Sequence, residues 1–510
     1  MRISFKKLPA HNPPSCEKSV RYSLHRPFRH PGFGWSKRVI GVSALLWLLS
    51  ITCTDQQPVE PQRHTPSYAE YSIAIPVLDQ DSIAIACTFS NGTRFILPCH
   101  FFDNPVDSLS GTTVRDLHIT DGSGEPVDFQ SDSGMIGPVM NRKIVLPAAT
   151  EYPVTIRYRL DLSVIHRDSS ARIMPRVYIG NGSMYLPGSY FLILPELSTS
   201  LAGLWRSPYE SRVFIEPGAG LTIYGIPGQT FTCSTLYELL FIQLSAGRDV
   251  AGSGYGGGVH FVFLDFLGKT YPSSTIDSVI TLFSGILDQI ASVYGPFSGD
   301  PYTIGFHNIR GGVEGTFGFD VGEPASGPDS RFAEILAHEA LHYFIGIRCG
   351  DYVDPWWKES AATYLGLETM VRLKFYSNGF FKARMTAPFI YADTLRFQHA
   401  LSDPWLRVNM FHQSLHALVY ERGAQVMMLL DVKVRRGSEN RYTLHDVIAD
   451  LCRNFSGRAF SREDFIDALE RYGAGDVPAF FTAYVDNRFP VLDSAVLNRA
   501  YSQLDSLAGY

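Results

Sequence analysis

The sequence lacks the features that mark several common classes of protein. Its seven cysteines form no CxxC pair or other close spacing, which excludes a zinc ribbon, and no segment repeats at a fixed period. Charged residues make up only 18% of the chain, a proportion unlike that of a disordered tail or a coiled coil, and nothing indicates a nucleotide or another organic cofactor. Hydrophobic residues make up 45% and aromatic residues 13%, so the 510 residues can fill two or three domains.

The N-terminal region lacks a hydrophobic run long enough to span a membrane. Nine Lys or Arg and one acid occupy residues 1–38, and the apolar run 39–52 is shorter than the roughly 20 residues of a transmembrane helix. Cys53 follows directly, and the stretch LLSITC resembles a bacterial lipoprotein signal, in which the cysteine is lipidated. We expect residues 1–53 to be a leader that anchors an exported protein to a bacterial membrane through Cys53, facing the periplasm or the cell exterior. An ordinary signal peptide and an uncleaved anchor stay open as alternatives.

The balance of charge bears on the partners of the mature chain. Without residues 1–52, the chain keeps 35 basic and 49 acidic residues, a net charge of −14. A strongly acidic surface repels phosphate backbones. We therefore expect no nucleic-acid partner.

The first half of the chain has the pattern of a β domain. Residues 54–67 are polar and proline-rich, as in a linker. From residue 68 to about 250, apolar or alternating runs such as YSIAIPVL, SIAIACTF, VTIRYRLDL and ELLFIQL are separated by turn signals. This pattern predicts an all-β, sandwich-like domain over 68–250, followed by a glycine-rich linker over 246–258.

The pattern changes after that segment. Within 255–390, two strand-like runs, HFVFLDF (260–266) and YTIGFHN (302–308), enclose a long helical pattern over 274–294, and two more helices follow. Residues 391–510 are mostly helical, with helix start signals at Thr443, Ser461 and Asp476. The expected fold is therefore multidomain, with an all-β domain, an α+β domain and a C-terminal α-helical domain.

One helical segment carries residues of a metal site. The stretch FAEILAHEALHYFIG (332–346) has helical apolar spacing and places His338 and His342 one turn apart, on one helix face. Two imidazoles so placed can bind one zinc ion, while Glu339 is rotated by about 100° and can reach a water molecule beside the metal. An HExxH string also arises by chance, so the surrounding sequence has to support it.

Glu359 supplies the third ligand that such a site needs. Sixteen residues separate it from His342, and it lies in a second predicted helix, WWKESAATYLGLE, that begins with Asp354 as N-cap and Pro355 at the first position. Two antiparallel helices can bring Glu359 to the histidine pair. The sequence therefore predicts a Zn²⁺ site made of His338, His342 and Glu359.

These segments resemble those of a known group of enzymes. AHEALHYFIG and WWKESAATYLG are similar to the zinc signature of gluzincin metallopeptidases, notably the aminopeptidase N and glycyl aminopeptidase families. The segment RGGVEG (310–315) resembles their substrate loop, and VYERGA (419–424) resembles their YEKGA segment. The resemblance covers about residues 300–490.

The resemblance implies a thermolysin-like catalytic domain over 255–390 and a role for each matching residue. Glu339 is expected to act as general base, and Tyr420 to donate a hydrogen bond to the developing oxyanion. Gly311 and Gly312 are expected to lie along the substrate, and Glu314 to bind its free α-amine. The expected activity is zinc-dependent hydrolysis of a peptide or protein substrate by an aminopeptidase.

Two departures from these families bear on the exopeptidase assignment rather than on the zinc chemistry. The spacing between His342 and Glu359 is shorter than is usual in aminopeptidase N relatives, and Gly315 stands where Asn or His is usual. Two alternatives stay open: an endopeptidase with the same zinc site, in which Glu314 is a solvated loop acid, and a lipid-anchored binding protein that has lost turnover. The sequence leaves the oligomeric state open.

Overall fold

The computed structural model describes most of the chain beyond residue 67. The described residues are 68–75, 82–98, 113–136, 139–161, 178–180, 183–197, 208–218, 220–247, 250–309, 311–324, 328–349, 356–387, 399–403, 406, 415, 417–456, 460–488 and 492–508. The predicted leader, the linker and the lipidation site at Cys53 lie outside them and stay predictions. The predicted helix start at Asp354 and Pro355 also lies outside.

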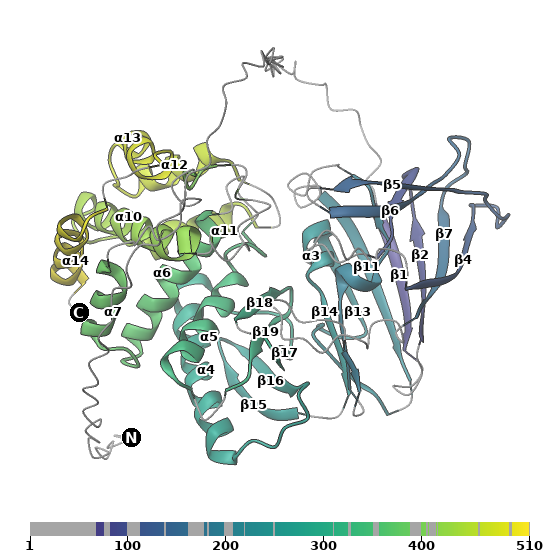
Figure 1. The fold of residues 1–510 in the computed structure, drawn as a ribbon, viewed down its shortest axis with the longest axis horizontal. Coiled ribbons are helices and arrows are strands. Elements are labelled where there is room, and N and C mark those ends of the chain that lie inside the picture. Colours follow the sequence, from purple (N-terminus) through teal and green to yellow (C-terminus); the bar gives the residue numbers. More distant parts are fainter. Residues whose placement is uncertain are drawn as a thin grey trace, which may run out of the picture. The chain divides into compact units, whose positions relative to one another are not determined.

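A six-stranded sheet forms the largest part of the β-rich N-terminal region (Figure 1). The apolar side chains of its strands alternate with more exposed ones, as in β7, where Val154, Ile156, Tyr158 and Leu160 are buried. The strand order is β13 (Thr230–Thr235), β11 (Pro208–Pro217), β1 (Tyr68–Ile75), β2 (Ser82–Phe89), β7 (Val154–Asp161) and β4 (Val114–Thr120), and only β11 and β1 pair in parallel.

Two four-stranded sheets make up the rest of the described β-rich region. The first has the order β10 (Leu194–Pro195), β3 (Arg94–Ile96), β6 (Val139–Val145), β5 (Gln130–Ile136), and the second β12 (Thr222–Tyr224), β14 (Gln243–Gly247), β9 (Ser183–Pro187), β8 (Tyr178–Gly180). A continuous cluster of buried hydrophobic residues extends across this region.

The expectation of an all-β region is wrong at two short helices, α1 (Gly188–Phe191) and α3 (Leu236–Leu240). The run ELLFIQL, predicted as a strand, begins inside α3. Its helix is started by a capping box, in which the Thr235 hydroxyl accepts from the Glu238 N–H at 3.1 Å and the Glu238 carboxylate accepts from the Thr235 N–H at 3.3 Å. Local capping here overrides the strand preference of the apolar run, and β14 begins only at Gln243.

The next sheet has five strands in the order β15 (Val250–Gly256), β16 (Val259–Asp265), β17 (Tyr302–His307), β19 (Gly318–Gly322) and β18 (Gly312–Gly315). Strands β16, β17 and β19 are parallel, whereas β15 and β18 are antiparallel to their neighbours and form the two edges. The predicted strands over 260–266 and 302–308 are confirmed as β16 and β17.

The predicted glycine-rich linker is wrong, because part of it forms β15. Its glycines let helix α4 (Ser273–Tyr294) approach closely: a Cβ on Gly256 would lie 2.8 Å from the Cα of Ser284. Helix α4 is long and apolar enough in composition to cross a membrane, yet its buried residues recur at helical spacing and belong to the core that includes this sheet.

The remaining described elements are helical. Helices α5 (Ser330–His342) and α6 (Trp356–Arg372) are neighbours, and α6 also contacts α10 (Gly423–Gly437) (Figure 1). The predicted starts at Thr443, Ser461 and Asp476 are confirmed as N-caps. The other elements are α7 (Asn378–Thr386), the π-helical turns η2 (Leu418–Arg422) and η3 (Phe481–Val485), α10 (Gly423–Gly437), α11 (Leu444–Asn454), α12 (Arg462–Arg471), α13 (Val477–Phe480) and α14 (Ser494–Ala508).

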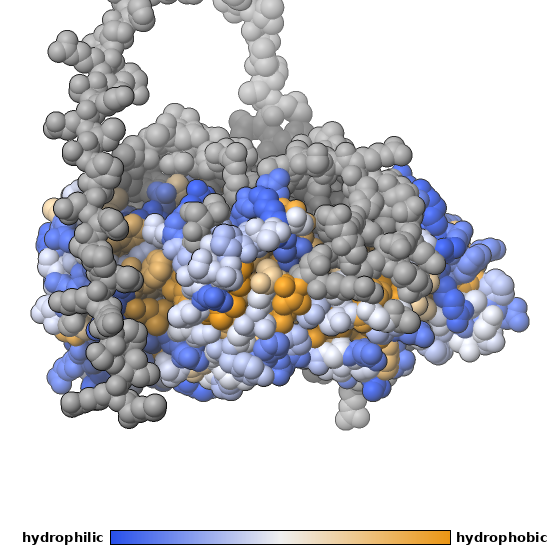
Figure 2. Space-filling model, turned by 90° about the horizontal axis from the view of Figure 1, so that it is seen from below, coloured by the Kyte–Doolittle hydropathy of each residue, from blue (hydrophilic) through white to orange (hydrophobic). Residues whose placement is uncertain are grey.

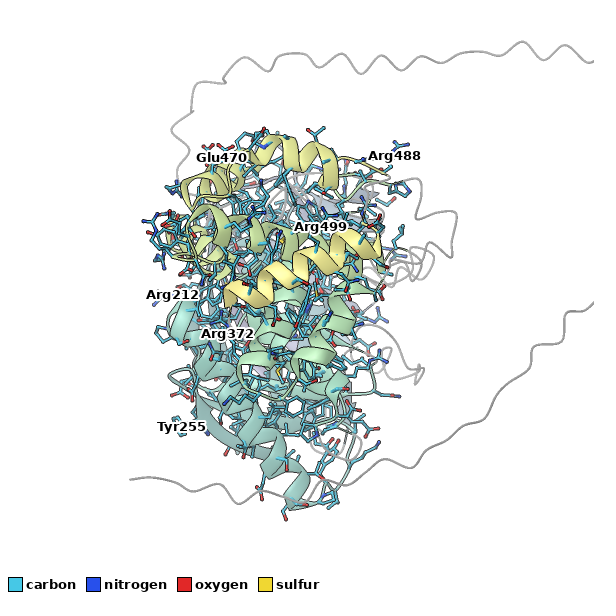
Figure 3. The ribbon with its side chains drawn as sticks, turned by 90° about the vertical axis from the view of Figure 1, so that its left-hand side faces the viewer. Arg212, Tyr255, Arg372, Glu470, Arg488 and Arg499 are labelled. Carbon is cyan, nitrogen blue, oxygen red and sulfur yellow. The ribbon has the colours of Figure 1, made fainter. Side chains whose placement is uncertain are left out.

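The described surface is mixed in polarity. Figure 2 shows a face on which hydrophobic areas lie between hydrophilic ones. In Figure 3 the labelled side chains of Glu470, Arg488 and Arg499 lie on the outer side of the helical region, and Tyr255, which is 73% exposed, lies near the sheet edge. Cys87, Cys233, Cys349 and Cys452 are buried, and none of these four forms a disulfide within the described part of the chain.

Candidate metal centre

Three predicted ligands converge at the contact between α5 and α6. The Nε2 atoms of His338 and His342 lie 2.9 Å apart, and Oε2 of Glu359 lies 3.3 Å and 3.2 Å from them. Tetrahedral zinc with bonds of about 2.0–2.1 Å would hold its ligand atoms about 3.3 Å apart. These side chains therefore have the type and the spacing of a zinc site.

The outer hydrogen bonds of the two histidines leave both Nε2 atoms available. Nδ1 of His342 lies 3.0 Å from the carbonyl oxygen of Ile345, which can only accept. Nδ1 of His338 lies 3.2 Å from the hydroxyl of Thr363, whose own proton goes to the Glu359 carbonyl oxygen at 2.8 Å. Both rings thus carry a proton on Nδ1, so that the two Nε2 atoms and a carboxylate oxygen face one another. These three atoms have to share a cation, which is a metal ion or, in its absence, a proton on Nε2 of His342.

Glu339 lies beside these ligands rather than among them. Its Oε1 is 4.0 Å from Nε2 of His338, and its buried Oε2 has no hydrogen-bond partner among the residues that the structure describes. Burial raises the pKa of the Glu339 carboxyl well above its usual value, and the carboxylates of Glu314 and Glu359 add to the effect. The arrangement provides a basic carboxylate aimed at the space next to the ligands, which suits an acceptor of a proton from water.

Charges within the site shift the other pKa values in opposite directions. Burial would lower the pKa of His342, but the carboxylates of Glu359 and Glu314 outweigh it and raise the value to about 9. Burial, followed by the neighbouring His342, lowers the pKa of His338. Burial would raise the pKa of Glu359, yet His342 and Lys358 hold it well below its usual value. Glu359 is therefore ionised, as a carboxylate that binds a metal ion has to be.

Tyr420 is placed at the same site by the turn η2. Its ring stacks on that of His338, with centroids 5.6 Å apart, and its hydroxyl forms a hydrogen bond with Glu359. The preceding carbonyl, of Val419, accepts from the Ser360 hydroxyl at 2.8 Å, which fixes η2 against α6. A tyrosine hydroxyl close to the ligand set can donate to a negatively charged oxygen there.

The predicted substrate loop forms the edge strand β18. The Gly311 carbonyl accepts from the Gly322 N–H at 3.0 Å, and a Cβ on Gly312 would lie 2.3 Å from Cγ of Glu339. The strand can approach Glu339 this closely only because position 312 is glycine. Glu314 follows on β18, and its Oε1 accepts from the Tyr237 hydroxyl at 3.1 Å. All the predicted site residues that lie in the described part of the chain therefore gather in one place.

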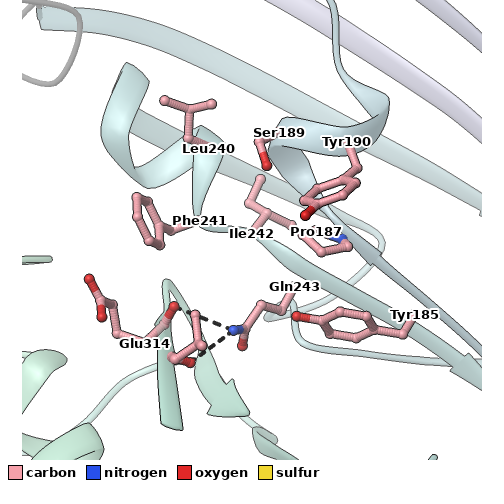
Figure 4. Close-up of a pocket in the computed structure, with 10 residues that line it drawn as sticks. Tyr185, Pro187, Ser189, Tyr190, Leu240, Phe241, Ile242, Gln243 and Glu314 are labelled. Atoms are coloured by element: carbon pink, nitrogen blue, oxygen red, sulfur yellow. Dashed lines mark hydrogen bonds between the residues drawn. The ribbon is translucent and has the colours of Figure 1, made fainter. Parts of the chain in front are cut away.

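A pocket adjoins Glu314 (Figure 4). It is lined by residues of the second four-stranded sheet, α1, α3 and β18: Tyr185, Pro187, Ser189, Tyr190, Leu240, Phe241, Ile242, Gln243, Val313 and Glu314. The Gln243 amide donates to the carbonyl oxygens of Val313 and Glu314 at 3.2 Å and 3.3 Å and so ties β14 to the edge strand. The β-rich region thus contributes one wall next to the candidate metal centre.

Lys358 and Tyr237 are parts of the site that the sequence did not reveal. The Lys358 ammonium donates to Oε1 of Glu314 and to the Tyr237 hydroxyl, the latter at 3.1 Å, and lies 3.5 Å from Oε1 of Glu359. The available signal was a basic residue next to the ligand glutamate in the apolar helix start WWKESAA. Tyr237 had no signal, because it reaches the site only through contacts between distant parts of the chain.

Known structures share this fold. An aminopeptidase N family protein from Idiomarina loihiensis matches with a TM-score of 0.58 and 14% identity, over 82% of this chain and 76% of that chain. An M1 zinc metallopeptidase from Deinococcus radiodurans matches with a TM-score of 0.53 and 15% identity, over 84% and 96%. A mutant of the latter, solved with a Tyr-Ser-Ala substrate, matches with a TM-score of 0.52 and 16% identity, over 83% and 95%. No family model and no curated protein matches the chain.

The chain therefore has the multidomain fold of the M1 zinc metallopeptidases, with a β-rich N-terminal region and a helical C-terminal region. The resemblance to the aminopeptidase N family, first indicated by short motifs, extends to the fold over most of the chain. At 14–16% identity the likeness establishes the fold, and the activity has to be argued from the site.

Proposed function

We propose that this protein is a zinc-dependent peptidase that cleaves at the free N-terminus of peptides. The observation that carries the proposal is the convergence of Nε2 of His338, Nε2 of His342 and Oε2 of Glu359 within 3.3 Å of one another. These three side chains would hold the metal. The shared fold supports the proposal, because the neighbours are described as zinc metallopeptidases.

Zinc, when bound, supplies a Lewis acid that polarises a carbonyl and lowers the pKa of water. The remaining roles belong to the chain. Glu339 takes the proton of the attacking water and passes it to the leaving amine, which its raised pKa favours. Tyr420 donates a hydrogen bond to the oxygen that becomes negatively charged in the tetrahedral intermediate.

Glu314 is the proposed acceptor for the substrate's α-ammonium. Glu314 lies on an edge strand, where a peptide can lie alongside Gly311 and Gly312. The pKa of its carboxyl is held below its usual value, because Lys358 and His342 outweigh the effect of burial. A carboxylate at the end of such a groove selects the terminal residue. The adjoining pocket would receive that residue's side chain.

The finer architecture is part of the same proposal. Residues 255–390 would form a thermolysin-like catalytic domain, between a sandwich-like domain over 68–250 and a helical domain over 391–510. The protein would be exported and held at a bacterial membrane through lipidated Cys53. Its substrate would be a peptide, in keeping with the Tyr-Ser-Ala bound by one structural neighbour.

The test compares wild type with Glu339→Gln for zinc content and for cleavage of unblocked and N-acetylated aminoacyl fluorogenic peptides. Glu334→Gln, the same change elsewhere on α5, is the matched control. We expect zinc in all three proteins and cleavage of unblocked substrates by wild type and the control only. Equal cleavage of N-acetylated peptides would identify an endopeptidase. Bound zinc without cleavage would favour a binding protein, and absence of zinc would reject the proposal.

A further inference from the structure

The proposed amine acceptor already has a partner within the chain. The Lys358 ammonium and the Tyr237 hydroxyl both contact the same oxygen of Glu314, Oε1, and Lys358 also donates to the Tyr237 hydroxyl at 3.1 Å. The three side chains form a closed triangle that joins α6, α3 and β18. The charge with which Glu314 would attract a substrate ammonium is therefore balanced by Lys358.

Lys358 is held in this place by its surroundings. Its side chain is only 11% exposed, and that of Glu314 only 14%. Its stem lies over Gly346, where a Cβ would come within 2.6 Å of the Lys358 Cδ, and its ammonium lies 5.8 Å from the centroid of the Tyr237 ring. A lysine packed along its length is a fixed charge of the site rather than a mobile surface group.

A second ammonium at Glu314 would meet this fixed charge. Two like charges that approach one carboxylate oxygen repel each other, and the repulsion is strong where little water screens it. The carboxylate of Glu359, 3.5 Å from the Lys358 ammonium, further holds the lysine at the site. A peptide with an acylated N-terminus carries no such charge and does not suffer this repulsion.

We propose that Lys358 is a specificity-determining residue, which competes with the substrate's α-ammonium for Glu314 and so shifts the preference of the site from free toward acylated N-termini. The proposal rests on the proposed function, since it takes Glu314 as the amine acceptor. It assigns Lys358 no role in the hydrolytic step, so the change it predicts lies in selectivity rather than in turnover.

Binding measurements test this without turnover. In the zinc-loaded Glu339→Gln protein, titration calorimetry would compare L-leucinamide with N-acetyl-L-leucinamide, with Lys358 intact and as Lys358→Gln. We expect Lys358→Gln to tighten binding of L-leucinamide about tenfold or more and to leave the acetylated compound nearly unchanged. Lys382→Gln, at an exposed lysine on α7, is the matched control and should change neither affinity.

Two further variants test whether the effect depends on the charge of Lys358 and whether it acts through Glu314. Lys358→Arg keeps the charge and should keep the original selectivity, and adding Glu314→Gln to Lys358→Gln should abolish the gain for L-leucinamide. An unchanged or reduced preference for L-leucinamide in Lys358→Gln would overturn the inference, as would a gain that survives the loss of Glu314. If wild type cleaves no peptide, the proposed function fails, whereas the binding comparison still decides the role of Lys358.

Discussion

Thr363 fixes the proton of His338 although the two residues lie on different helices. The Thr363 hydroxyl donates to the Glu359 carbonyl oxygen at 2.8 Å, so its lone pair faces Nδ1 of His338 at 3.2 Å. Thr363 on α6 thereby orients the ring of His338 on α5 so that its Nε2 atom points toward the other proposed ligands. Outer contacts of this kind hold the ligand ring in its orientation and so contribute to the affinity for the metal.

The first prediction concerns this contact. Thr363→Val keeps the shape of the side chain and removes the hydroxyl, so His338 is free to change its tautomer and its ring orientation. We expect zinc affinity to fall about 10- to 100-fold, measured by competition with a chromogenic chelator. Thr386→Val is the matched control, because Thr386 makes the same hydroxyl bond to the carbonyl four residues earlier, away from the site. Equal zinc affinity in the two variants would contradict the prediction.

The second prediction concerns removal of the metal. Without a metal ion, three ligand atoms lie within 3.3 Å of one another in a buried site with only a proton on His342, whose pKa is raised to about 9, to hold them together, and a divalent ion compensates them better. Zinc should therefore stabilise the fold, by about 4 kcal/mol when free zinc exceeds the dissociation constant 1,000-fold. Thermal unfolding with a chelator and with added zinc measures the effect. In His342→Ala the difference in Tm should largely disappear, and an equal shift in this variant would show that zinc acts elsewhere.

Local sequence was sufficient to predict the centre of the site. His338 and His342 share a helix face because of their spacing, and a marked helix start followed by a carboxylate indicated Glu359. What could not be predicted depends on the approach of distant segments. The Lys358 side chain reaches β18 and α3 rather than solvent only because these elements pack against the start of α6.

The errors in the fold have a similar physical origin. The glycine content of 246–258 predicts a linker, but Gly252, Gly254 and Gly256 alternate along β15 and allow α4 to pack on it. Glycines at every second position are compatible with a strand, but the high glycine content of the segment suggested a linker instead. The capping box of Thr235 and Glu238 was also present in the sequence, and it outweighed the apolar run that suggested a strand.

The third prediction concerns a buried charge cluster between α6, α10 and α11. Glu368 contacts Arg372 at 2.8 Å, Arg435 at 3.1 Å and His445 at 2.8 Å. Burial would raise the pKa of Glu368, but His445, Arg372 and Arg435 outweigh burial and hold it far below the usual range, although Asp431 lies nearby. Glu368→Gln should lower the free energy of unfolding at pH 7 by about 3–5 kcal/mol, as measured by urea denaturation.

The sign of its pH dependence follows from the direction of the shift. Because the folded-state pKa of Glu368 is depressed, its contribution to stability is fully present above the unfolded value of about 4.3 and is lost as the pH falls below it. The difference between wild type and Glu368→Gln should therefore shrink between pH 5 and the lowest pH at which the protein folds. A difference that grows over this range would show that Glu368 is not stabilised as a carboxylate.

The fourth prediction concerns Tyr420. Tyr420→Phe removes the hydroxyl and keeps the ring that stacks on His338. We expect kcat to fall about 10²- to 10³-fold with KM nearly unchanged, because a hydrogen bond to the oxyanion forms only in the transition state. Steady-state kinetics on an unblocked aminoacyl substrate would show this, and a change confined to KM would assign Tyr420 to substrate binding instead.

The last prediction uses two adjacent glycines of β18. A Cβ on Gly312 would lie 2.3 Å from Cγ and 2.6 Å from Oε1 of Glu339, whereas a Cβ on Gly311 would meet nothing within 4 Å. The added methyl group of Gly312→Ala should push the Glu339 carboxylate out of its position. A misplacement of about 1 Å can lower the rate about 100-fold. We expect kcat of Gly312→Ala to fall about 100-fold while Gly311→Ala stays near wild type. Because the atoms nearest to a Cβ on Gly312 belong to Glu339 and not to a proposed ligand, zinc content should be equal in both variants. A loss of zinc in Gly312→Ala would show that β18 supports the metal site itself rather than Glu339 alone.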